Sequence, residues 1–200
     1  MDDIAQFKGL HNGKRLFILA SGPSLGQLDL NPLSRRMVMG LNRSFMIYPN
    51  SYYHCTMDHR LFEEYPKEMK AVRQLFTLEG RPYGTLLNLL GAEGFSWDLE
   101  KGIYSGYTVS YFALQVAVYM GFKEIFYLGL DLKHQDGNTH FFGYDYHSSD
   151  HETTEFLKMS RMLNYAKEIL APTDIKVFNC SPVSTLKCFE HVTFDDALSR

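Results

Sequence analysis

The 200-residue sequence lacks a long apolar run, because its longest mainly apolar stretch, Val109 to Met120, is interrupted by Ser110 and Gln115. That stretch is shorter than the roughly 20 residues that a membrane-spanning helix needs. The first residues, Met1 to Ile4, are acidic and no apolar run follows them, which predicts that no secretory signal is present. We therefore expect a cytoplasmic protein, with peripheral contact at the inner face of the membrane as an open alternative.

The sequence is also poor in cysteine and has no excess of positive charge. Its three cysteines, Cys55, Cys180 and Cys188, are odd in number and lack metal-ligand spacing, which favours reduced thiols over a disulfide framework. The formal net charge of −3 provides no general attraction to nucleic acid, so no nucleic-acid partner is expected. With 45% apolar and 22% charged residues, the chain is predicted to fold as a single globular domain over 1–200.

Several common catalytic patterns are missing. The glycine turn Ser21-Gly22-Pro23-Ser24 is neither a G-x-G-x-x-G segment nor a P-loop, because the Walker lysine is absent. There is no D-x-D pair of the kind with which many sugar-nucleotide enzymes hold a metal ion. The cysteines and loop serines lie in no nucleophile elbow or Cys–His signature. The sequence therefore argues against standard dinucleotide, P-loop and covalent-nucleophile sites.

Short apolar runs of strand length recur along the chain, at 15–20, 37–41, 52–57, 74–78, 123–129 and 174–179. Helical spacing predicts helices at 61–69, at 109–120, and from the capping box Ser149-x-x-Glu152 to Leu170. Strands that alternate with helices predict an α/β protein with a Rossmann-like, doubly wound, mainly parallel sheet. Residues 79–104 show no clear pattern and are predicted to form a small irregular insertion or lid.

Polar residues follow three of these strands where each one ends. Asn42, Asp58 and Asp131 come after the runs 37–41, 52–57 and 123–129. Open α/β sheets bind ligands at the carboxyl ends of their strands, so we expect these side chains at one edge. The turn 21–24 lies between a strand and a predicted helix start, an arrangement that binds anions. A solvated loop or a ligand-free turn is the alternative at each position.

A loop over 131–150 contains most of the residues suited to proton transfer. With the next residue included, the segment 131–151 holds four histidines and two tyrosines, together with a lysine: His134, His140, His147, His151, Tyr144, Tyr146 and Lys133. Histidine accepts protons near neutral pH, so the set suits a reaction in which a hydroxyl attacks and a phosphate leaves. A metal site is one alternative, although the spacings of six, seven and four match no standard ligand pattern. Incidental surface histidines are another.

Four segments, taken in order, resemble known families: 19–25, 40–43, 117–131 and 138–143. They resemble the bacterial lipooligosaccharide sialyltransferases of the Campylobacter type, glycosyltransferase family 42. They resemble even more closely the bacterial branch of the domain family named for archaeal 6-hydroxymethylpterin diphosphokinase. The first resemblance implies a variant GT-A fold, a CMP-linked acidic sugar as donor and a glycan or lipo-oligosaccharide as acceptor. It also implies inversion by a histidine base, no metal ion or other cofactor, and a homo-oligomer.

The resemblance also implies roles for individual residues. Tyr144 stands where those enzymes carry the base histidine, so His147, three residues on, is the favoured base and His140 the remaining candidate. Ser21 stands where they carry asparagine, and Lys133 with His134 where they carry a phosphate-binding tyrosine. The predicted nucleotide-binding residues are Ser21, Gly22, Pro23, Ser24, Asn42, Asp58, Thr108, Gly129, Asp131, Lys133 and His134.

The second resemblance implies a different reaction, in which a diphosphoryl group passes from ATP to a hydroxymethyl pterin. That reaction needs Mg²⁺, which prefers oxygen ligands, and Asp58, Asp131 and Asp136 are the candidate carboxylates. A third hypothesis is a non-catalytic module that binds a nucleotide sugar, because a fold alone does not establish activity.

Overall fold

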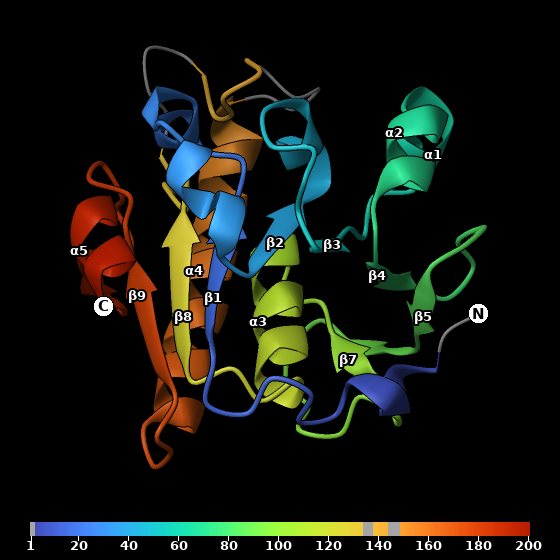
Figure 1. Ribbon diagram of the computed structural model, residues 1–200. Coiled ribbons are helices and arrows are strands. Elements are labelled where there is room, and N and C mark those ends of the chain that lie inside the picture. Colours follow the sequence, from blue (N-terminus) through green and yellow to red (C-terminus); the bar gives the residue numbers. More distant parts are fainter. Residues whose placement is uncertain (1–2, 134–137, 144–148) are drawn as a thin grey trace.

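An eight-stranded sheet, in which every pairing is parallel, forms the centre of the computed structural model (Figure 1). The structure describes residues 3–133, 138–143 and 149–200, with 149–153 as backbone only. The strands are β1 (Arg15–Leu19), β2 (Val38–Leu41), β3 (Tyr53–Cys55), β4 (Leu75–Leu78), β5 (Thr85–Leu87), β8 (Glu124–Leu128), β9 (Lys176–Asn179) and β10 (Glu190–His191). Their order is β10-β9-β8-β1-β2-β3-β4-β5. The chain is thus an α/β protein with a doubly wound parallel sheet, as predicted.

The strand order reverses direction between β1 and β8, which are hydrogen-bonded neighbours. From β1 the chain proceeds through β2, β3, β4 and β5 on one side, and later through β8, β9 and β10 on the other. Such a switch point leaves a crevice at the carboxyl ends of the two central strands, because the connections depart in opposite directions. In Figure 1 this is the upper edge of the sheet, where the segments that follow β1 and β2 (blue) gather.

Two helices, α3 (Val109–Tyr119) and α4 (Ser149–Leu170), pack on one face of the sheet. The sequence predicts only an apolar stripe on α3, yet every residue of that helix is buried. The reason is that the segment 93–107 covers its outer side. Gln115 accepts hydrogen bonds from the backbone N–H groups of Ser96 and Tyr104 and donates to the carbonyl oxygen of Tyr104.

The opposite face has a thinner cover of 3-10 helices and the short helix α5 (Phe194–Ser199). After β1 the sequence predicts a helix that begins near Pro23, but the structure has two 3-10 helices, η2 (Pro23–Gln27) and η3 (Asn31–Arg35). Gly26 and Pro32 explain the difference, because glycine weakens a helix and proline disfavours the helical conformation of the residue before it. The first crossover therefore contains no α-helix.

Other departures from the prediction also have local causes. The helix predicted at 61–69 is divided into α1 (Arg60–Glu64) and α2 (Pro66–Ala71), because Pro66 cannot continue the hydrogen bonding of α1. The segment predicted to be irregular contributes β5 to the main sheet and forms a separate pair, β6 (Leu89–Gly91) with β7 (Ile103–Tyr104). Strands of two or three residues are too short to show a period of two. The remaining elements are η1 (Ile4–Phe7) and η4 (Asn42–Met46).

The three cysteines are free and buried, in agreement with the prediction of thiols. Within the described ranges, no helix combines the length and the apolarity that a bilayer span requires.

Candidate functional site

A cavity of about 520 Å³ lies at the carboxyl edge of the sheet, at the switch point between β1 and β8. Its wall comes from the segments that follow β1 (20–22), β2 (41–42), β3 (57–60) and β8 (129–132). The start of α3 (107–110), residues 139–140 and three residues of α4 complete it. A volume of this size accommodates a small ligand. The cavity is therefore the candidate ligand site.

The predicted site residues divide into three groups by their position. Those that line the cavity are Ser21, Gly22, Asn42, Asp58, Thr108, Gly129, Asp131 and His140. Those that the structure places away from its wall are Pro23, Ser24 and Lys133. His134, Asp136, Tyr144 and His147 lie outside the described residues.

Backbone strain is concentrated around this cavity. In the described part of the chain, the non-glycine residues with positive φ are Asn42 (46°), Tyr107 (61°) and Leu132 (47°). All three line the cavity. The left-handed conformation is costly for residues other than glycine, and such strain clusters at ligand sites because the surrounding structure must maintain it. The distribution of strain thus marks the same place as the switch point.

Asp131 organises the turn after β1 rather than leaving it open. Its carboxylate accepts hydrogen bonds from the Ser24 backbone N–H (2.9 Å) and the Ser24 hydroxyl (2.6 Å), and the residue is 2% exposed. Gly22 is required beside it, because a Cβ at that position would lie 2.5 Å from the Asp131 carboxyl group. The N–H group of Ser24, which the sequence suggests for anion binding, donates instead to an anion of the protein itself.

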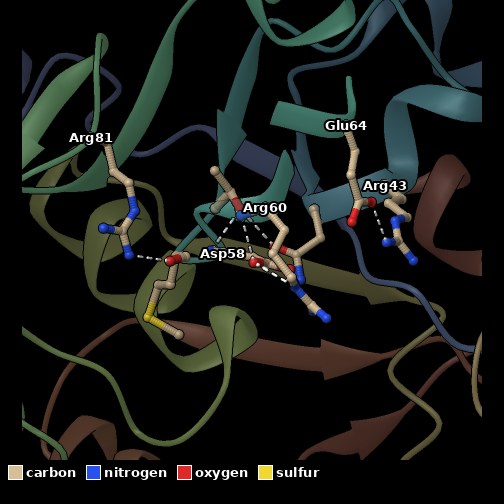
Figure 2. Close-up of polar contacts among 8 residues, drawn as sticks. Arg43, Asp58, Arg60, Glu64 and Arg81 are labelled. Carbon is tan, nitrogen blue, oxygen red and sulfur yellow. Dashed lines mark hydrogen bonds and ion pairs between the residues drawn. The ribbon is translucent and has the colours of Figure 1, made fainter. Parts of the chain in front are cut away.

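Asp58 is held in a similar way, by Arg60 (Figure 2). The Arg60 side chain donates Nε to Oδ1 (3.0 Å) and Nη2 to Oδ2 (2.7 Å), and its backbone N–H also donates to Oδ1. Burial alone would raise the pKa of Asp58, but the hydrogen bonds and the charge of Arg60 outweigh it, so the pKa is lowered. Arg81 supports the same strand end by donating to the Met57 carbonyl oxygen at 2.8 Å.

These contacts bear on the predicted magnesium ligands. Both oxygens of Asp58 and both oxygens of Asp131 already accept hydrogen bonds from protein groups. Among the described residues, no cluster of three or more histidine, cysteine, aspartate or glutamate side chains has an arrangement that could hold a metal ion. Asp136, the third candidate carboxylate, lies outside the described residues, so the Mg²⁺ site that the diphosphokinase resemblance implies stays a prediction.

His140 reaches the cavity from a segment that is anchored to the turn after β1. The backbone N–H of Phe141 donates to the Ser21 carbonyl oxygen at 2.9 Å. The His140 ring stacks on Phe142, with ring centroids 4.8 Å apart, and its Nδ1 lies 2.9 Å from the Thr139 hydroxyl oxygen. His140 is thus the predicted base candidate that the described structure places at the cavity.

Arg43 connects the same segment to the region after β3. Its guanidinium lies 4.8 Å from the centroid of Phe142 and 5.6 Å from that of Tyr65. It also forms an ion pair of 2.9 Å with Glu64 (Figure 2). Arg43 is 8% exposed, so this cation is almost completely buried, and both rings lie within cation–π distance of it. The contacts join α1 to the segment that carries His140.

Two parts of the wall have no counterpart in the sequence prediction. Tyr107 donates from its hydroxyl to Glu93 (2.9 Å), so the insertion supports one side of the cavity. Phe156 and Met159 contribute apolar surface from α4. Gly106, just before Tyr107, is the one local signal, because a glycine between a strand and a helix often marks an unusual backbone. No sequence pattern singles out Phe156 or Met159 from the other apolar residues of α4.

The fold is shared with solved glycosyltransferases. The sialyltransferase CstII from Campylobacter jejuni, in complex with cytidine-5'-monophosphate, is similar at 15% identity and a TM-score of 0.58, over 91% of this chain and 86% of that chain. The sialyltransferase CST-II in complex with a trisaccharide acceptor and CMP is similar at 18% identity and a TM-score of 0.54, over 90% and 86%. No protein-family model and no curated protein sequence matches the chain. At these identities the likeness establishes the fold, and the diphosphokinase resemblance stays a prediction.

Proposed function

We propose that the protein is a glycosyltransferase that moves an acidic sugar from a CMP-linked donor to a hydroxyl group of a glycan. The cavity at the switch point between β1 and β8 is the observation that carries this proposal. It combines strained backbone, histidines and an ion pair with an apolar wall, in a fold shared with sialyltransferases solved with CMP. That combination suits a ligand that has a polar phosphate and a ring system.

The proposed chemistry is an inverting, metal-independent displacement. The acceptor hydroxyl forms a bond to the anomeric carbon of the sugar while the bond from that carbon to the CMP phosphate oxygen breaks. His140 accepts the hydroxyl proton, and CMP leaves with the bonding electrons and their negative charge. His59 and Arg60 line the same cavity, and both side chains carry N–H groups of the kind that donate hydrogen bonds to a leaving phosphate. The engagement of Asp58 and Asp131 by protein groups favours this route over Mg²⁺-dependent transfer from ATP.

Binding of CMP tests the donor half of the proposal. A ligand present at 100 times its dissociation constant stabilises a protein by roughly 2.7 kcal/mol, which a thermal shift detects. We expect a shift with CMP and with a CMP-linked acidic sugar, and none with ATP and Mg²⁺. A shift with ATP and Mg²⁺ alone would refute the glycosyltransferase proposal and favour the diphosphokinase. CMP binding without transfer to any oligosaccharide acceptor would favour the non-catalytic module.

The base is tested by replacing each histidine candidate. His140→Ala is expected to lower kcat by a factor of about 10² to 10⁴ and to leave CMP affinity nearly unchanged, because it removes the proton acceptor only. His147→Ala tests the candidate favoured from the sequence. His191→Ala, on the exposed strand β10, is the matched control and should change neither quantity. Loss of kcat in the His147 variant alone would reassign the base.

A further inference from the structure

Asn42 is the strained cavity residue whose support the structure describes most completely. It is the first residue of η4, follows β2 directly, and has a φ of 46°. Asparagine visits the left-handed region more readily than most residues, but single residues remain there only when their neighbours maintain them. Two buried side chains provide that support: His54, on the neighbouring strand β3, and Thr56, which follows β3 directly.

Thr56 holds the side chain of Asn42. Its hydroxyl donates to Oδ1 of Asn42 at 3.0 Å and accepts a hydrogen bond from the backbone N–H of Asp58 at 3.2 Å. Thr56 is completely buried. Asn42 lines the cavity, and because its Oδ1 already accepts the Thr56 hydroxyl, the amide nitrogen is the polar group of its side chain that is left for another partner. Nδ2 forms no hydrogen bond within the part of the chain that the structure describes.

His54 holds the backbone of the same residue. Its Nε2 lies 2.8 Å from the carbonyl oxygen of Asn42, and a carbonyl only accepts, so Nε2 carries the proton. The ring is completely buried. Gly40 makes room for it, because a Cβ at that position would lie 2.6 Å from Nδ1 of His54. The side chain and the backbone of Asn42 are therefore fixed by separate donors.

We infer that Thr56 is a positioning residue, which with His54 holds Asn42 so that its amide N–H groups donate to an acceptor atom of the bound nucleotide. The inference rests on the proposed function, since CMP is the nucleotide in question. It identifies a residue that lies behind the cavity wall and acts through another residue. An asparagine amide free to rotate would present its oxygen and its nitrogen with similar frequency, and ordering it at binding would reduce affinity.

A double-mutant cycle on CMP binding, measured by calorimetry, tests the inference. Asn42→Ala and Thr56→Val are each expected to weaken CMP binding about tenfold, which corresponds to about 1.4 kcal/mol. Thr56→Ser keeps the hydroxyl and is expected to restore affinity to within about threefold of the parent protein. In the Asn42→Ala background, Thr56→Val should have no further effect, because its action passes through the asparagine. Additive losses would overturn the inference.

Thr77→Val is the matched control for the loss of a buried threonine hydroxyl. Thr77 is as buried as Thr56, lies on β4 away from the cavity, and its hydroxyl has no hydrogen-bond partner among the described residues. It should leave CMP affinity unchanged. If it weakens binding as much as Thr56→Val does, the effect is general destabilisation and the inference fails.

A second measurement separates this inference from the proposed function. The same cycle is performed on urea unfolding, with Asn42→Gly, which keeps the left-handed backbone and removes the amide. Thr56→Val should lower the urea midpoint less in the Asn42→Gly background than in the parent protein. Coupling in urea without CMP binding would overturn the proposed function and retain the positioning of Asn42. CMP binding without coupling in either cycle would retain the proposed function and overturn the positioning of Asn42 by Thr56.

Discussion

The buried imidazole of His54 makes folding stability depend on pH in a way that can be calculated. Burial lowers the pKa of His54 from 6.5 to about 4, and the hydrogen bond with the Asn42 backbone opposes that change only in part. The folded protein therefore holds His54 neutral at pH values where the unfolded chain protonates it. We consider the variant His54→Gln, because glutamine retains an N–H donor for the Asn42 carbonyl oxygen and does not titrate.

The sign and the size follow from proton linkage. Between about pH 4 and pH 6.5 the unfolded wild-type chain binds more protons at His54 than the folded protein does. The contribution of neutral His54 to the free energy of unfolding is therefore complete above about pH 6.5 and is lost as the pH falls towards about 4. A tenfold change in proton affinity corresponds to about 1.4 kcal/mol. The lowering of the His54 pKa from 6.5 to about 4 therefore corresponds to a full loss of about 3 kcal/mol in the free energy of unfolding. By about pH 5, the calculated loss is about 2 kcal/mol.

The assay is urea unfolding of wild type and His54→Gln at several pH values from about 7.5 to 4.5. Other groups titrate in both proteins, and the difference between the two free energies of unfolding removes their contribution. We expect the stability of the wild type relative to the variant to fall by about 2 kcal/mol between pH 7.5 and 5. A difference that stays constant over this range would show that His54 has an ordinary pKa, and the account of its burial would be refuted.

Three further predictions concern residues that hold the site in place. Ser24→Ala removes one hydrogen bond to the buried Asp131 carboxylate and should cost about 1.5–3 kcal/mol in urea unfolding; a loss below about 0.5 kcal/mol would contradict that role. Gln115→Met should increase amide hydrogen exchange over 93–107, and unchanged exchange there would show that other contacts hold the insertion. Gly106→Ala places a methyl group 2.2 Å from a buried tyrosine ring at a φ of 56° and should destabilise well beyond the roughly 1–2 kcal/mol of backbone strain. Gly13→Ala, at a φ of 76° with open space around it, is its control, and equal losses would exclude a steric effect.

The strands were the most predictable part of the fold. Continuous apolar runs at 15–20 and 123–129 reflect burial on both faces of a parallel sheet, and they form the neighbouring central strands β1 and β8. The helix predicted at 109–120 is α3, because six apolar residues recur at helical spacing. The crossover after β1 and the strands within 79–104 were not predictable, since turns of a few residues carry no period.

The order of strands and polar residues also indicated where ligand-facing groups would lie. Asn42, Asp58 and Asp131 follow different strands, and parallel strands end at a common edge, so the structure places all three at one cavity. What each one does there was not predictable. Asp58 is paired with a residue two positions away, whereas Asp131 is bound by a residue 107 positions away in the sequence. Local sequence can therefore indicate the pairing of Asp58 with Arg60, but not the pairing of Asp131 with Ser24.

By itself, the sequence determined the parallel α/β architecture and the edge at which polar residues collect, because burial on both faces imposes a composition and a period on each element. Only the tertiary structure decided which of those residues are engaged by the protein and which face the cavity. The carboxylate of Asp131 is turned to Ser24, and the amide of Asn42 is turned by Thr56. Those orientations depend on partners brought together by folding. The left-handed backbone at Tyr107 and Leu132 likewise occurs in residue types that seldom adopt it.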